Sequence, residues 1–189
     1  MIGRNMSNLD AAGTYAKPIP GGYVMRIESV SNNKQKETIE MCLEFAEGDL
    51  RDYCKGIKDR FGFWPAKCNK SYKEKALPFF KAFIEVVRRS NANTDGLVIG
   101  DYEDVDETKL IGKSIGVVVG EREYDGNDGT RKKGIDWYNA TFVTIDDIRA
   151  GNFTVPELRI TGTSAPTQTA DVVDMSASFG PVNDDDAPF

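Results

Sequence analysis

Cationic and aromatic side chains alternate along one stretch of the chain, residues 51–91. The stretch holds eleven Lys or Arg against four Asp or Glu, a local net charge of +7, whereas the whole chain has a net charge of −6. Cations neutralise the phosphates of a nucleic-acid backbone, and flat rings stack on unpaired bases of any sequence. The pattern therefore predicts binding of single-stranded nucleic acid. The cations expected at phosphates are Arg51, Lys55, Lys58, Arg60, Lys67, Lys70, Lys73 and Lys75, and the rings expected at bases are Tyr53, Phe61, Phe63, Trp64 and Tyr72.

Within this stretch, residues 61–65 read Phe-Gly-Phe-Trp-Pro. Gly and Pro interrupt both helical and strand periodicity, so an exposed loop carrying three rings is expected here. Burial in the core is the alternative for each of the other rings, and it stays open.

A second cationic and aromatic group lies further along the chain. It consists of Arg122, Tyr124, Arg131, Lys132, Lys133, Trp137 and Tyr138. Two interpretations are open for it. Either the group forms a second wall of the DNA-binding surface, or it is an ordinary charged turn with Trp137 in the core.

Several catalytic chemistries are excluded by composition. The chain has no histidine, so Ser-His-Asp and Cys-His catalysis and histidine metal sites are ruled out. A P-loop ending at Gly112-Lys113-Ser114 would need a glycine where Glu107 stands. A cluster of five acids could bind Mg²⁺ for a nuclease, but a solvated loop is favoured: Asp101, Glu103, Asp104, Asp106 and Glu107. We therefore predict a protein that is not an enzyme and has no metal or cofactor, and whose three cysteines are free thiols.

The expected elements follow from hydrophobic periodicity. Strands are predicted at 23–30 and 39–45, joined as a hairpin through 31–36, with a shorter third strand at 50–57. Ser71 and Glu74 have capping-box spacing, and a helix is predicted from near Leu77 to Arg89. Two more strands are expected at 114–124 and 135–145, separated by the turn at 125–129. A helical turn at 146–150 follows, closed by Gly151.

Three strands, one helix and two strands is the element order of the OB-fold. We therefore predict a mainly β domain, a five-stranded OB-fold-like barrel with a helix between strands 3 and 4. Such barrels bind single strands across one face and through connecting loops. The predicted domain spans residues 1–161, with residues 1–17 either part of it or a flexible extension.

Residues 162–189 differ in composition from the body. They contain five Asp and no Lys or Arg, so the body is left with 24 basic and 25 acidic residues. This segment has too little apolar surface to offset the entropy of ordering, and we predict a disordered acidic tail. Its last residues place a proline and an aromatic ring after an acidic run. The partner-binding residues expected there are Asp184, Asp185, Asp186, Pro188 and Phe189, and the alternative is a merely solubilising tail.

This tip resembles that of bacterial and phage single-stranded-DNA-binding proteins, in which an Asp run ends in Pro-Phe or Phe. The body is similar to the phage-encoded branch in its long 61–75 loop, its Leu110-Ile111-Gly112-Lys113 segment and its Asp146-Asp147-Ile148 turn. The resemblance implies a non-catalytic protein that coats single strands during phage DNA replication, recombination or repair. It also implies that the tail recruits replication and recombination proteins.

A protein-interaction adaptor with incidental DNA affinity is the alternative. Because the sequence has neither an apolar run of membrane-spanning length nor a signal peptide, we expect no membrane association and a cytoplasmic location in the bacterial host. Assembly into a homo-oligomer stays open.

Overall fold

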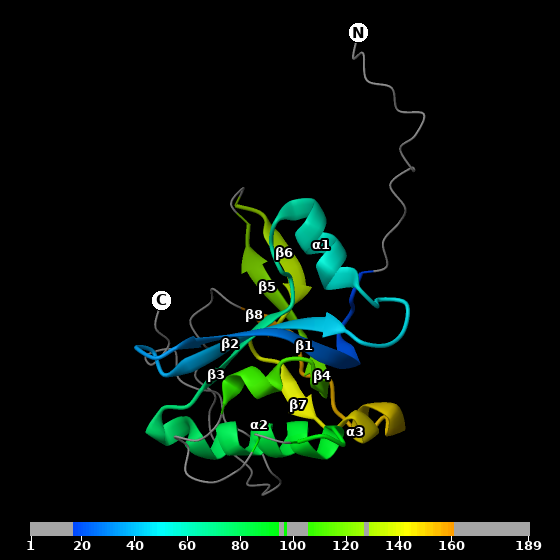
Figure 1. The fold of residues 1–189 in the computed structure, drawn as a ribbon. Coiled ribbons are helices and arrows are strands. Elements are labelled where there is room, and N and C mark those ends of the chain that lie inside the picture. The colour runs from blue at the N-terminus through cyan, green and yellow to red at the C-terminus, as the bar shows by residue number, and fades with distance from the viewer. Residues whose placement is uncertain (1–16, 95–96, 98–105, 127–128, 161–189) are drawn as a thin grey trace, which may run out of the picture.

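The computed structural model describes residues 17–94, 97, 106–126 and 129–160, and it is mainly β (Figure 1). The main sheet is curled and antiparallel, with strand order β3-β2-β1-β4-β7. A smaller sheet has the order β6-β5-β8. The strands are β1 (Gly21–Asn33), β2 (Thr38–Phe45), β3 (Lys67–Ser71), β4 (Ser114–Val119), β5 (Glu121–Asp125), β6 (Arg131–Ile135), β7 (Thr141–Val143) and β8 (Arg159–Ile160). The helices are α1 (Tyr53–Phe61), α2 (Leu77–Ser90) and α3 (Ile145–Ala150), with 3₁₀ turns η1 (Glu74–Ala76) and η3 (Glu107–Leu110).

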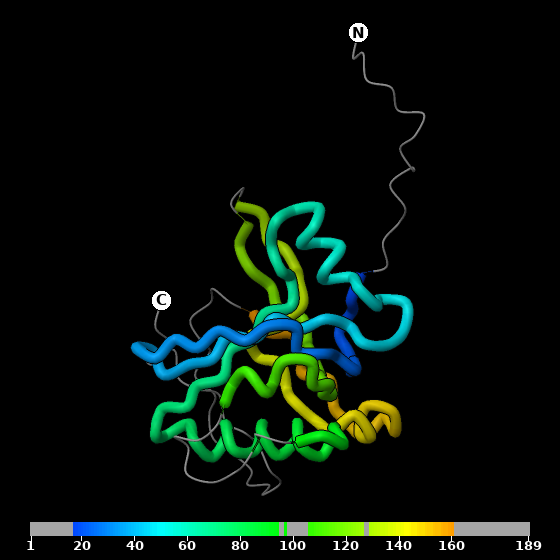
Figure 2. Tube along the Cα trace, in the orientation of Figure 1, coloured from blue at the N-terminus to red at the C-terminus, as the bar shows by residue number. Residues whose placement is uncertain are grey.

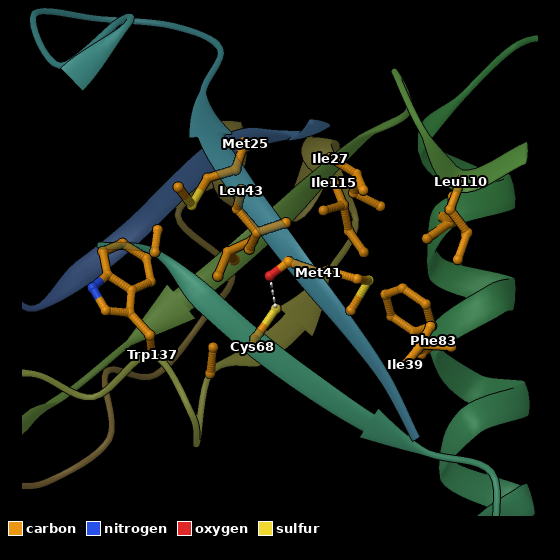
Figure 3. Close-up of a cluster of buried hydrophobic side chains, with 14 of the residues drawn as sticks. Met25, Ile27, Ile39, Met41, Leu43, Cys68, Phe83, Leu110, Ile115 and Trp137 are labelled. Carbon is orange, nitrogen blue, oxygen red and sulfur yellow. Dashed lines mark hydrogen bonds between the residues drawn. The ribbon is translucent and has the colours of Figure 1, made fainter. Parts of the chain in front are cut away.

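Alternating side chains of β1 and β2 build the core. Met25 and Ile27 from β1, and Ile39, Met41 and Leu43 from β2, are almost completely buried. Figure 3 shows these side chains gathered between the strands, beside Phe83 of α2. A period of two is what a strand with one core-facing side requires. The predicted strands at 23–30 and 39–45 are therefore confirmed.

Helix α2 lies below the main sheet in Figure 1. Its buried residues are Phe80, Phe83, Ile84 and Val87, which is the spacing of one helix face. Pro78 stands in the first turn, where its missing N–H costs nothing. The predicted helix from near Leu77 is confirmed.

The two edge strands of the main sheet approach each other through their side chains. The Nζ atom of Lys70 on β3 lies 4.6 Å from the ring centroid of Phe142 on β7. The Phe142 ring in turn packs edge-on against Phe83 of α2, with centroids 5.1 Å apart. The sheet therefore curls into a half-barrel whose seam, between β3 and β7, is lined by α2. The tube in Figure 2 shows the same curl along the chain trace.

The predicted third strand at 50–57 is wrong, because residues 53–61 form helix α1. Strand β3 lies instead at 67–71, inside the segment predicted as a long loop. Periodicity misled here because the segment is short and mostly polar, and only Cys54 of the helix is buried. The capping box at Ser71 is also wrong. Ser71 ends β3, and its Oγ accepts a hydrogen bond from the Lys73 amide, 3.2 Å away, with no such bond to Glu74.

The two later predicted strands differ from the observed ones. Residues 114–124 separate into β4 in the main sheet and β5 in the small one. Of the predicted strand at 135–145, residue 135 ends β6 and residues 141–143 form β7. Gly120 stands at the first break, where an added Cβ would lie 2.9 Å from the carbonyl oxygen of Pro156. Segment 155–157 passes so close to Gly120 that a side chain would not fit there, at the point where β4 ends and β5 begins.

The predicted helical turn after the fifth strand is confirmed as α3. Thr144 caps it in a capping box with Asp147, and Gly151 closes it with a positive φ of 74°. Within the described part of the chain, no helix has the length and apolar composition needed to cross a membrane.

Candidate nucleic-acid interface

Helix α1 is fastened to the main sheet by a buried carboxylate. Glu44 of β2 is 1% exposed. Its Oε1 accepts hydrogen bonds from the amides of Phe45 (2.9 Å) and Cys54 (3.0 Å), and its Oε2 accepts one from the Lys55 amide (2.7 Å). The N-cap residue Asp52 has a positive φ and makes no side-chain cap. Glu44 therefore supplies both the missing cap and the negative charge that a helix N-terminus favours.

The rings that follow α1 divide into anchored and exposed ones. Trp64 is half-buried against the core, and its Nε1 donates a 2.8 Å hydrogen bond to the Leu43 carbonyl. Phe61 and Phe63 are 60% and 57% exposed, with ring centroids 6.4 Å apart. The exposed-loop prediction thus holds for Phe63. Phe61 belongs to the end of the helix, which Gly62 terminates with a φ of 80°.

A hollow of about 460 Å³ lies between the end of α1 and the outer face of β1, β2 and β3, and we call it the α1 groove. Its lining consists of Glu28, Ser29, Cys42, Lys58, Gly62, Phe63, Trp64 and Lys67. The Lys58 ammonium lies 5.5 Å from the Trp64 ring centroid. Lys67 Nζ lies 3.1 Å from Glu40 Oε1, and this hydrogen-bonded carboxylate raises the pKa of Lys67. Two lysines therefore stand beside two rings in the α1 groove.

The β5–β6 hairpin and the loop after it provide an opposite side. The Arg122 guanidinium lies 5.5 Å from the Tyr124 ring centroid and 5.8 Å from that of Tyr138. Both tyrosines are exposed, Tyr138 to 56%. We call Arg122, Tyr124 and Tyr138 the hairpin wall.

The other cations of this hairpin are ion-paired. Arg131 pairs with Glu123 and Asp125, and Lys133 pairs with Glu121 and Glu123. The antiparallel register produces these pairs, since it places Lys133 opposite Glu123 and Arg131 opposite Asp125. Lys132 also has an interaction partner. Exposed pairs of this kind contribute little stability, but they neutralise the cations that they hold.

Four sequence candidates lie mainly in the core or at the seam. Trp137 is 8% exposed and packs against Phe45, so the base-stacking role predicted for it is wrong and the core interpretation is confirmed. Tyr53 packs edge-on against the same Phe45 ring, and the half-buried Tyr72 donates a hydrogen bond to Asn32. Lys70 is the seam lysine, and burial lowers its pKa.

The remaining cations lie at the two ends of the β2–β3 face. Lys55 and Arg60 are exposed on α1, and Arg51 before it donates to the Ala46 carbonyl. Lys73 and Lys75 follow β3 at its far end, beside the 34–37 turn, where the Tyr72 amide donates to the Glu37 carbonyl. That turn brings two cations absent from the sequence prediction, Lys34 and Lys36. Their position opposite Ser71 depends on the β2–β3 register, which the sequence does not reveal.

Of the five acids considered for Mg²⁺, three lie outside the described residues: Asp101, Glu103 and Asp104. Asp106 accepts hydrogen bonds from the Thr108 hydroxyl and from the Thr108 amide, which lower its pKa, and Glu107 accepts one from Asn32. Both carboxylates thus hold η3 in place. No group of three or more metal-ligating side chains is found in the described part of the chain.

Cys42, Cys54 and Cys68 are free thiols, as expected. The acidic tail and its tip lie outside the described residues. No protein-family model and no curated protein matches this sequence.

Proposed function

We propose that the protein is a non-catalytic single-stranded-DNA-binding protein. One observation carries the proposal: the α1 groove places Lys58 and Lys67 beside Phe63 and Trp64. These residues come from α1, the segment after it and β3. Phosphates would lie on the ammonium groups, and bases would stack on Phe63 and the hairpin-wall tyrosines, with only the exposed part of Trp64 within reach.

The strand pairing supports an OB-fold for the body. Strand β1 pairs with both β2 and β4, β2 pairs with β3, and β4 pairs with β7. This is the order of a five-stranded OB barrel opened between its third and fifth strands, with α2 between the third and the fourth. The β5–β6 hairpin occupies the connection between the fourth and fifth strands. OB-folds bind oligonucleotides on the face of strands 2 and 3 and through that connection, which is where the groove and the hairpin wall lie.

The resemblance of the sequence to phage-encoded proteins extends this proposal. The protein would coat single strands during replication or recombination in the cytoplasm of a bacterial host. The Asp184–Asp186 run with Pro188 and Phe189 would bind replication or recombination proteins. These partners are proposals from the sequence alone.

Titration with oligo(dT) and a matched duplex over a range of salt tests the central proposal. Single strands should bind more tightly than the duplex, with a log–log salt slope of roughly −0.7 per phosphate contacted. Phe63→Ala should weaken binding by about 1–3 kcal/mol because a stacking ring is lost. Phe79→Ala is the matched control, since Phe79 is also half exposed but lies on α2. Absence of binding at low salt, or equal binding of the duplex, contradicts the proposal.

The adaptor alternative is favoured by one observation, the exposed pair of Phe61 and Phe63. Neighbouring exposed apolar rings also suit a protein partner. The same titration separates the two functions. Under the adaptor hypothesis DNA affinity is incidental, so single strands bind no more tightly than the duplex, and Phe63→Ala weakens only the capture of a protein.

A further inference from the structure

A second hollow, of about 520 Å³, lies on the other side of the segment that leads into α1. It is formed by β1, the 46–51 segment, the end of α2, the start of β4 and α3. Four guanidinium groups line it, one from each of four of these elements, and we call it the arginine pocket. They belong to Arg26, Arg51, Arg89 and Arg149.

The charge of this pocket exceeds what its carboxylates neutralise. The lining holds two acids, Glu47 and Asp146, against the four arginines. Arg149 Nη2 lies 2.6 Å from Glu47 Oε1. Arg89, on the last turn of α2, has no ion-pair partner among the described residues. Arg26 is also paired, with Glu28, so the excess charge rests on Arg51 and Arg89, which have no ion-pair partner among the described residues. This excess favours an anionic ligand.

The chemistry of the lining narrows the class of anion. Guanidinium groups bind the oxygens of phosphate through two parallel N–H donors, which a lysine cannot do. The pocket lining includes no aromatic ring on which a base could stack. The pocket is therefore suited to the phosphates of a nucleic acid rather than to its bases.

The arginine pocket and the α1 groove adjoin each other along β1. Arg26 lines the pocket, Glu28 lines the groove, and the two side chains form an ion pair. The β1–β2 register shifts at Glu28, and the Arg26–Glu28 ion pair is what places the two hollows side by side. A nucleic-acid strand that leaves the groove thus meets Glu28 first and the arginines next.

We propose that the arginine pocket continues the DNA path, binding backbone phosphates of the nucleotides that extend beyond the α1 groove. This inference rests on the proposed function. Glu28 lies at the boundary between the two sites. Its ion pair with Arg26 must break before a phosphate can bind the Arg26 guanidinium. Single strands long enough to fill both sites should therefore gain affinity from the pocket, and short ones should not.

The experiment uses the full chain and oligo(dT) of two lengths, about 6 and about 20 nucleotides, one near the lower end of the site sizes of about 4–16 nucleotides per OB-fold and one beyond their upper end. The test variant is Arg89→Gln/Arg149→Gln, in which both arginines are exposed side chains. Arg88→Gln is the control, because Arg88 neighbours Arg89 on α2, pairs with Glu85 and does not line the pocket. Unfolding midpoints in urea verify that both proteins stay folded.

For the long oligonucleotide, the double variant should lose roughly tenfold in affinity at low salt. Its log–log salt slope should shrink by about 0.7 for the phosphate contact of Arg89, and by about 1.4 where Arg149 exchanges Glu47 for a phosphate. Binding of the short oligonucleotide, and both affinities of Arg88→Gln, should stay as in the wild type. Glu28→Gln should raise the affinity for the long oligonucleotide.

Three results overturn the inference. If the double variant matches the wild type at both lengths while the wild type binds, the pocket is not on the DNA path although the proposed function stands. If the wild type binds neither oligonucleotide, the proposed function fails and this inference with it. If a peptide of residues 184–189 binds the wild type but not the double variant, and DNA affinity is unchanged, the pocket takes carboxylates instead.

Discussion

The two sides of the proposed DNA site contain the same residue types but differ in how their charges are used. On α1, Lys55 and Lys58 have no ion-pair partner among the described residues. On the β5–β6 hairpin, Arg131 and Lys133 each face two carboxylates. Asp59 of α1 stands at i,i+4 from Lys55, yet it forms no ion pair within the described part of the chain, whereas the two-stranded register of the hairpin sets acids directly opposite cations. A count of cations in the sequence therefore overstates the charge of the hairpin.

The two sides also differ in how they are attached. The α1 side depends on two anchors, the Glu44 carboxylate under the helix and the Trp64 indole on the Leu43 carbonyl. The hairpin has its own β5–β6 ladder, and backbone pairing of β5 with β8 attaches it to the body. Single side-chain substitutions should therefore detach the α1 side more readily than the hairpin.

The largest effect is expected for Glu44→Ala. It leaves three backbone amides without their acceptor, at a cost of about 3 kcal/mol in unfolding free energy. Urea denaturation measures this loss. Glu40→Ala is the control, an exposed carboxylate on the same strand paired with Lys67, whose removal should cost less than about 1 kcal/mol. Equal midpoints for the two variants contradict the anchoring role.

Trp64→Ala should lower the unfolding free energy by about 2 kcal/mol, because a half-buried ring and its hydrogen bond are lost. The sequence instead predicts Trp64 in an exposed loop, where a ring contributes little to the unfolding free energy. Phe63→Ala removes a smaller ring from an exposed position. Its unfolding free energy should stay within about 0.5 kcal/mol of that of the wild type. If Trp64→Ala unfolds at the wild-type midpoint, the indole is not an anchor.

The charge difference between the two sides predicts unequal effects on DNA binding. Lys58→Gln should weaken oligo(dT) binding about fivefold, or about 1 kcal/mol, and reduce the salt slope by about 0.7. Lys133→Gln should change affinity by less than about twofold, since its charge is already neutralised by Glu121 and Glu123. Equal losses of affinity for Lys58→Gln and Lys133→Gln would contradict this, because they would show that the ion pairs of Lys133 break when DNA binds.

The smallest effect concerns Lys70, which the sequence groups with the α1 cations but which lies at the seam. Burial lowers its pKa in the folded state, so the unfolded chain binds more protons between that value and the ordinary value of about 10.4. Stability from this group therefore rises as the pH increases through that window. The unfolding free energy of the wild type, relative to that of Lys70→Met, should increase from pH 7 to pH 10. A difference that stays constant contradicts the lowered pKa of Lys70.

Predictions from periodicity succeeded where a long element buries one regular face. Strands β1 and β2 alternate strictly in Met25, Ile27, Ile39 and Met41, and α2 repeats its buried phenylalanines at helical spacing. They failed at α1, because the residue that caps this helix, Glu44, is ten positions away from Cys54 and belongs to a strand. They failed again at Gly120, where the chain that forces the break arrives from Pro156.

The sequence by itself determined the main strands, the long helix and the abundance of cations and rings between residues 51 and 75, because each of these depends on neighbours in the chain. Only the tertiary structure decided which rings are exposed, which cations keep their charge free and where the two hollows lie. Burial of Trp137, pairing of Lys133 and the placement of Lys70 at the seam all depend on contacts between segments distant in sequence. Such contacts are set by strand register and packing, and local residue patterns carry no record of them.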